Sequence, residues 1–74
     1  MIKELNIKNE GQIRRINQIA SQAPYEVWLN SGTVMLDARS LLGLYALIGQ
    51  RVKVVAEDNV DPHCFGKLIS KMEK

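Results

Sequence analysis

Apolar residues in this chain recur with a strand-like period of two in some segments and with a helical period in others. Strand-like alternation is found at residues 4–8, 26–29, 33–37 and 51–56, and helical spacing at residues 11–22, 41–48 and 62–72. This order of elements predicts an α+β protein, with a four-stranded antiparallel sheet covered on one face by three helices. We expect Trp28 and Val55 to lie on the uncovered face.

Residues that break helices or favour turns separate these segments. Pro24 follows the first predicted helix, and Gly49 follows the second. Residues 30–32 (Asn-Ser-Gly) predict a hairpin turn in which Gly32 can adopt a positive φ. The pair Asp61-Pro62 predicts the start of the last helix, with the Asp61 carboxylate as its cap. The outward face of that helix is expected to carry Lys67, Lys71 and Lys74.

Length and composition favour a single small domain spanning residues 1–74. With one cysteine, no disulfide can form within the chain, which favours a reducing cytoplasm. The net charge of +2 arises from scattered basic residues, so we expect no direct binding of nucleic acid. No apolar run is long enough to span a bilayer, and no motif for a cofactor or a metal is present.

Residues 33–44 predict a strand that runs directly into a helix, with Ser40 at the helix start. We expect Ser40 to cap this helix, since serine is among the best capping residues. Unpaired backbone N–H groups at a helix start also favour negative charge nearby. Arg39 precedes this serine and can either pair with such a charge or face solvent.

Three blocks of the chain resemble the HPr phosphocarrier family of the bacterial phosphotransferase system. They are residues 26–32 (Glu-Val-Trp-Leu-Asn-Ser-Gly), residues 37–44 (Asp-Ala-Arg-Ser-Leu-Leu-Gly-Leu), and residues 51–57 (Arg-Val-Lys-Val-Val-Ala-Glu) together with residues 65–72. The resemblance covers residues 13–72. It implies an HPr-like open-faced β-sandwich of order βαββαβα.

HPr carriers have a phosphoacceptor histidine in a Gly-Leu-His-Ala-Arg-Pro-like motif before the first helix. This chain has Ile-Lys-Asn-Glu-Gly-Gln-Ile at residues 7–13, which contains no histidine. A gapless comparison through the first helix puts Asn9 at the histidine's place; the alternative is that this chain lacks the family's loop. An amide nitrogen has no available lone pair with which to accept phosphate. We therefore expect no histidine phosphotransfer and no enzyme activity. In this respect the chain is similar to the catabolite-repression paralogue of HPr.

The resemblance also implies a regulatory site and a docking surface. Ser40 matches the serine that an ATP-dependent HPr kinase phosphorylates, although it can equally be a plain helix cap. The apolar second helix implies protein docking through Leu41, Leu42 and Tyr45, together with Arg39. Leu42 and Tyr45 are expected to stay exposed; alternatively, flanking elements or a second copy of the chain cover them. By resemblance the partner is an HPr kinase or a transcriptional regulator.

The remaining polar candidates have simpler alternatives. Arg14 and Arg15, with Lys8, can hold an anion at the start of the first helix, or form a solvated face. His63 and Cys64 are adjacent on a helix and so make a poor metal site. We expect His63 to be exposed and Cys64 to join the apolar seam of its helix.

Three functions remain open at this point. The first is a non-catalytic regulatory or interaction module acting through Ser40 and the second helix. The second is a phosphocarrier between enzyme I and sugar-specific components, which requires a phosphoacceptor histidine. The third is an orphan HPr-fold domain with neither role.

Overall fold

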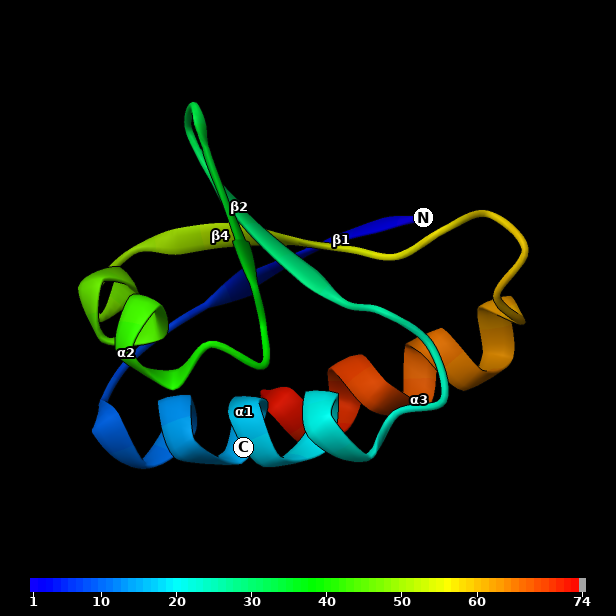
Figure 1. Ribbon diagram of the computed structural model, residues 1–74, viewed down its shortest axis with the longest axis horizontal. Helices are drawn as coiled ribbons and strands as arrows, with labels where there is room; N and C mark the ends of the chain where they lie inside the picture. The colour runs from blue at the N-terminus through cyan, green and yellow to red at the C-terminus, as the bar shows by residue number, and fades with distance from the viewer. Residues whose placement is uncertain (74) are drawn as a thin grey trace.

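The computed structural model describes residues 1–73 and contains the predicted elements in the predicted order (Figure 1). The strands are β1 (Ile2–Asn6), β2 (Trp28–Ser31), β3 (Val34–Asp37) and β4 (Arg51–Val55). The helices are α1 (Glu10–Gln22), α2 (Leu41–Leu44) and α3 (Pro62–Met72), and a short 3-10 helix, η1 (Tyr45–Leu47), follows α2 directly. The predicted outward position of Lys74 lies outside the described residues.

The strands form one sheet in the order β1-β4-β2-β3, and all neighbouring strands are antiparallel. Figure 1 shows α1 and α3 beneath this sheet, with α2 at the left end, between the level of the sheet and the start of α1. The other face of the sheet carries no helix among the described residues. The predicted α+β architecture, an open-faced sandwich with helices on one face, is confirmed.

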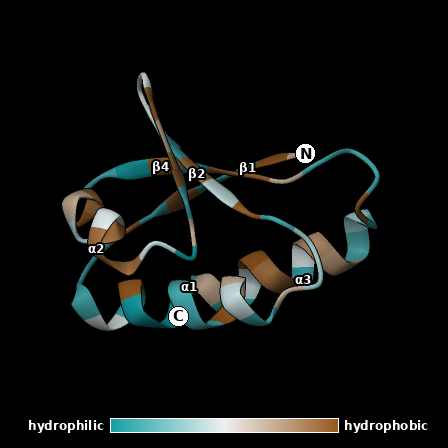
Figure 2. Cartoon of the chain, in the orientation of Figure 1, coloured by the Kyte–Doolittle hydropathy of each residue, from teal (hydrophilic) through white to brown (hydrophobic). Residues whose placement is uncertain are grey.

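The core lies between the sheet and the helices. Val54 of β4 pairs with Leu29 of β2, and both are fully buried. The helices contribute their apolar stripes, including Ile13 and Ile16 from α1 and Phe65 from α3. Figure 2 shows brown apolar residues alternating with teal polar ones along these helices, as expected for helices with one face in a core.

Side chains of the preceding residues start both long helices. The Asn9 side chain accepts a hydrogen bond from the Gln12 backbone N–H, so α1 begins one residue earlier than predicted. The Asp61 carboxylate accepts from the His63 backbone N–H at 2.9 Å, and Pro62 occupies the first position of α3. The predicted cap and start of the last helix are therefore confirmed.

The hairpin between β2 and β3 is tighter than predicted. Asn30 and Ser31 belong to β2, where they pair with residues of β3, so the turn is confined to Gly32-Thr33. Gly32 has a φ of 61°, which confirms the expected left-handed conformation. The prediction of a turn over residues 30–32 was wrong. A two-residue turn is enough to connect antiparallel strands, so Asn30 and Ser31 can still pair with β3.

The second helix is also shorter than predicted. Only Leu41–Leu44 is α-helical; η1 follows, and Ile48 is already extended. Gly49 then adopts a φ of 85° and donates its N–H to the Ile7 carbonyl at 2.7 Å. This bond anchors the connection to the end of β1, so the chain must leave the helix before residue 48.

Candidate functional site

The loop before α1 is held in place by the amide side chains of Asn9 and Gln12. Asn9 stands at the start of α1, and its Oδ1 accepts the Gln12 backbone N–H at 2.9 Å. The Asn9 side chain is exposed but is already used to cap the helix. As an amide, it offers no nucleophile for a phosphoryl group.

Gln12 lies behind this cap and is the one buried polar residue among residues 1–73, with 2% of its surface exposed. Its Nε2 donates to the carbonyl oxygens of Asn6 at 2.9 Å and Met72 at 3.0 Å, and its Oε1 accepts the Lys8 N–H at 2.8 Å. The side chain thus joins the end of β1, the loop before α1 and the end of α3. Sequence reasoning missed this residue, although its place next to Ile13, on the inward face of α1, was the available signal.

The two arginines of α1 are both exposed, and Arg14 already has polar partners. Arg14 pairs with Glu10 in the first turn of α1 and donates from Nε to the Tyr45 hydroxyl at 3.5 Å. The hydrogen bond to Tyr45 and the charge of Glu10 raise the pKa of Arg14. Arg15 is exposed on the same helix. An anion approaching this end of α1 would meet the Glu10 carboxylate, which weakens its attraction.

Ser40 precedes α2 and is exposed, with a hydroxyl that makes no capping hydrogen bond. Its backbone carbonyl accepts the Leu44 N–H at 3.2 Å, so it is the cap residue by position only. The expectation of a side-chain cap was wrong. Ser40 has a φ of −90° and a ψ of 89°, outside the extended backbone seen at the caps of α1 and α3, and its hydroxyl remains accessible.

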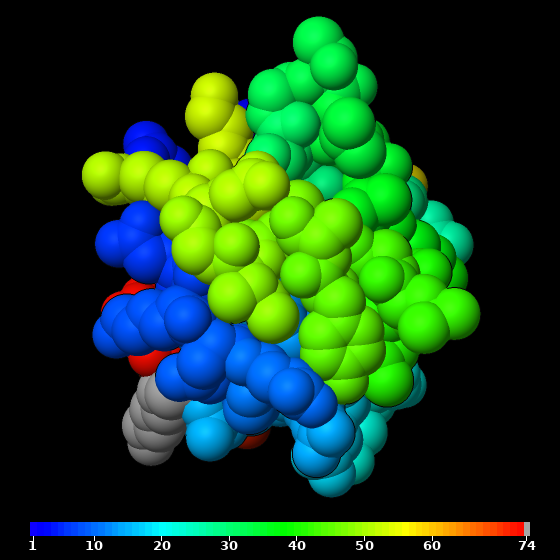
Figure 3. Space-filling model, turned by 90° about the vertical axis from the view of Figure 1, so that its left-hand side faces the viewer, coloured from blue at the N-terminus to red at the C-terminus, as the bar shows by residue number. Residues whose placement is uncertain are grey.

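We define the α2 surface as Leu41, Leu42, Tyr45 and Ile48. Leu42 is 87% exposed and Ile48 is 39% exposed, whereas Leu41 is half-buried against the core. Tyr45 is also half-buried, which corrects the expectation that it stays outside, because η1 turns its ring toward the core and its hydroxyl toward Arg14. Figure 3 views this side of the molecule, with the green atoms of this region between the hairpin above and the blue residues around the start of α1 below.

A charged cluster lies beside Ser40. Arg39 donates to both carboxylate oxygens of Asp37, at 3.1 Å and 2.9 Å, and reaches Glu26 at 3.4 Å. The hydrogen bonds from Arg39 hold the pKa of Asp37 below its ordinary value of 3.8. Arg39 is therefore already occupied by acidic neighbours and would have to exchange them to pair with a phosphate on Ser40.

The open face of the sheet carries an apolar row across its strands. Ile2, Val55 and Trp28 are cross-strand neighbours in β1, β4 and β2. Trp28 and Val55 are half-buried, which confirms their predicted place opposite the core, and Ile2 is 61% exposed. Asp37 of β3 ends the row and connects it to the Arg39 cluster.

The first turn of α3 exposes both His63 and Cys64. The exposed position of His63 is as expected, but Cys64 was predicted in the apolar seam and lies outside it. Phe65, the next residue, takes the buried position instead, because helical geometry turns adjacent side chains about 100° apart. Within residues 1–73, no three His, Cys, Asp or Glu residues are grouped so that they could hold a metal ion. Over the same range, no helix has the length and apolarity needed to cross a membrane.

Comparison with known proteins gives a likeness in structure. The chain matches no protein-family model and no curated protein sequence. Among solved structures it is similar to HPr-C-His from Thermoanaerobacter tengcongensis, with a TM-score of 0.76 and 22% sequence identity. The alignment covers 99% of this chain and 91% of that chain. The sheet and the helices described above therefore have the arrangement of the HPr fold.

Proposed function

We propose that this chain is an HPr-related regulatory module of the bacterial phosphotransferase system, which binds a protein partner through the α2 surface and does not carry phosphate on histidine. The single observation that carries the proposal is the exposure of Leu42, 87%, on a segment whose neighbour Leu44 is fully buried. An exposed apolar surface, here formed by Leu42 together with Ile48, is typical of a protein interface.

The loop before α1 supports the non-catalytic part of the proposal. Asn9 and Gln12 use their amides for structure, and neither can form a phosphoramidate. His63 is the sole histidine of the chain, and it lies at the start of α3 rather than in this loop. In these features the chain resembles the HPr paralogue of catabolite repression, which lacks the active histidine.

Ser40 is the proposed switch of this surface. Its hydroxyl makes no capping bond and is exposed, so a kinase can reach it without breaking an existing contact. A phosphate adds about −2 charges two residues before Leu42 and competes with Asp37 and Glu26 for Arg39. Phosphorylation would thus change both the charge beside the docking surface and the position of Arg39.

The experiment measures binding to purified bacterial HPr kinase by calorimetry. Leu42→Ser is expected to weaken binding by about tenfold or more, the effect of losing a central apolar contact. Ile2→Ser is the matched control, since Ile2 is also exposed but lies on the open sheet face. Equal affinities for the parent chain and the Leu42 variant would refute docking through the α2 surface. Incubation with the kinase and ATP should add one phosphate, which Ser40→Ala removes and Ser21→Ala retains.

A further inference from the structure

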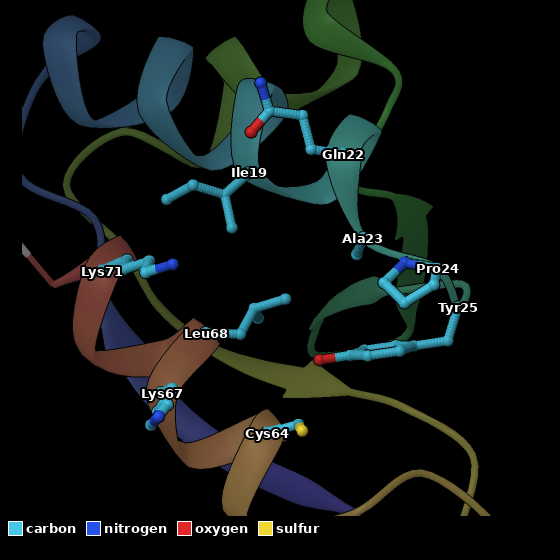
Figure 4. A pocket seen from close by; sticks show the side chains of 9 residues that line it. All are labelled: Ile19, Gln22, Ala23, Pro24, Tyr25, Cys64, Lys67, Leu68 and Lys71. Carbon is cyan, nitrogen blue, oxygen red and sulfur yellow. The ribbon is translucent and has the colours of Figure 1, made fainter.

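A pocket of about 400 Å³ lies between the C-terminal end of α1 and the outer side of α3. It is far from the α2 surface along α1, because that surface contacts α1 through Arg14, near the other end of the helix. Figure 4 shows the pocket and the side chains around it. Most of these are apolar: Ile19, Ala23, Pro24, Leu68 and the ring of Tyr25. The volume is within the usual range of small-molecule sites.

The charged residues of the pocket are all of one sign. Lys67 and Lys71, both from α3, line it, and no carboxylate of residues 1–73 does. Neither lysine takes part in an ion pair within residues 1–73. In Figure 4 the Lys71 side chain extends from α3 toward the space beside Ile19. An anion placed there would gain a cationic partner that the described part of the chain does not already neutralise.

The two ends of the pocket differ in chemistry. Lys71 lies at one end in Figure 4, whereas Pro24 and Tyr25 lie at the other. Tyr25 is half-buried, and burial together with Cys64 raises the pKa of its phenol. The phenol therefore stays neutral and places no negative charge at this end of the pocket. A neighbouring hollow of about 330 Å³ shares Pro24 and Tyr25 and takes in Asp61. The Asp61 carboxylate therefore lies beyond the apolar end of the pocket, away from the two lysines.

We propose that this pocket binds a small organic carboxylate that carries one aromatic ring or a short acyl chain. The carboxylate pairs with Lys71, with Lys67 adding to the local positive charge. The apolar group lies along Ile19 and Leu68 toward Pro24. An inorganic anion fits less well, because it would leave this apolar lining uncovered.

The test uses 4-phenylbutanoate as the probe and the full chain labelled with ¹⁵N. Titration should shift the backbone amide signals of Ala23, Leu68 and Lys71 and leave those of the α2 surface in place. Lys71→Gln should weaken binding by about three- to fivefold, the effect of losing one exposed ion pair. Lys53→Gln is the matched control, since Lys53 is an exposed lysine on the sheet. Neither substitution removes a buried side chain, so both variants are expected to fold.

The single cysteine gives an independent measurement. Cys64 lines the pocket and is exposed, so iodoacetamide should alkylate it readily, and bound phenylbutanoate should slow that alkylation severalfold. The neutral 4-phenylbutanol should bind more weakly than the carboxylate, and acetate should give no shifts in the pocket. Equal binding of the alcohol and the acid, or no effect of Lys71→Gln, would overturn the proposal. So would shifts confined to other regions, or a dissociation constant well above about 1 mM, which corresponds to a binding free energy weaker than about −4 kcal/mol.

Discussion

Replacement of Gln12 by alanine tests whether the loop before α1 is held by one buried amide. The substitution removes the hydrogen bonds to Asn6, Lys8 and Met72 and leaves their backbone groups without this partner. Each bond contributes about 0.5–1.5 kcal/mol, and the substitution also leaves a small cavity, so the free energy of unfolding should fall by about 2–4 kcal/mol. This is a large share of the total of about 4–11 kcal/mol typical of a chain of this length. Urea unfolding followed by circular dichroism measures the change.

Gln18→Ala is the matched control, because Gln18 lies on the same helix but is exposed. It should change the free energy of unfolding by less than about 0.5 kcal/mol. If Gln12→Ala behaves like this control, the reasoning that the buried amide holds the loop is refuted.

Gln12→Glu adds a test with a definite dependence on pH. The introduced carboxylate cannot donate to the carbonyls of Asn6 and Met72 when ionised, and burial raises its folded pKa above the unfolded value of about 4.3. Folding then favours the protonated form, so this variant should be most stable relative to the parent below about pH 4 and lose stability as the pH rises. A difference between variant and parent that does not vary with pH would contradict this.

Further expectations concern the backbone and the charges near the termini of elements. Gly49→Ala should destabilise the chain by about 1–2 kcal/mol, because Gly49 has a φ of 85° that alanine adopts only with strain. Gly66→Ala should stabilise it by about 0.4–1 kcal/mol, because Gly66 lies within α3 and an added Cβ would meet open space. Urea unfolding of both variants checks the sign of each change. Asp61→Ala should lower the free energy of unfolding by about 1 kcal/mol, because it removes the cap of α3. An unchanged midpoint of urea unfolding would show that the cap does not stabilise the fold. Arg39→Gln should raise the pKa of Asp37 toward 3.8, as read from carboxyl carbon shifts in NMR. Since the folded pKa of Asp37 lies below the unfolded one, the stabilisation by this pair is present above the unfolded pKa and is lost as the pH falls through the folded value.

Periodicity predicted most of the fold because β4 and the two long helices each expose one face and bury the other. The alternation around Val54 and the cap at Asp61 are local signals, and both elements begin and end close to their predicted limits. The second helix was overpredicted for a tertiary reason. The bond from Gly49 to Ile7 depends on where β1 ends, and no local pattern in residues 41–48 encodes that distance.

The candidate site was only partly predictable. The exposure of Leu42 could be inferred, because a short apolar helix cannot bury every face. The contact between Tyr45 and Arg14, and the engagement of Arg39 by Glu26, join segments distant in sequence and required the fold. Gln12 was overlooked because its hydrogen-bond partners, the carbonyls of Asn6 and Met72, are brought to it only by the tertiary fold.

The central claim, a regulatory HPr-like module without histidine phosphotransfer, is tested most directly by intact-mass spectrometry. The chain is incubated separately with enzyme I plus phosphoenolpyruvate and with HPr kinase plus ATP. The account predicts no added mass from phosphoenolpyruvate, and one phosphate from ATP that Ser40→Ala abolishes. Acid-labile phosphate acquired from phosphoenolpyruvate, and lost in His63→Ala, would contradict it and make the chain a phosphocarrier. No mass change in either incubation would contradict the Ser40 switch and favour an orphan HPr-fold domain.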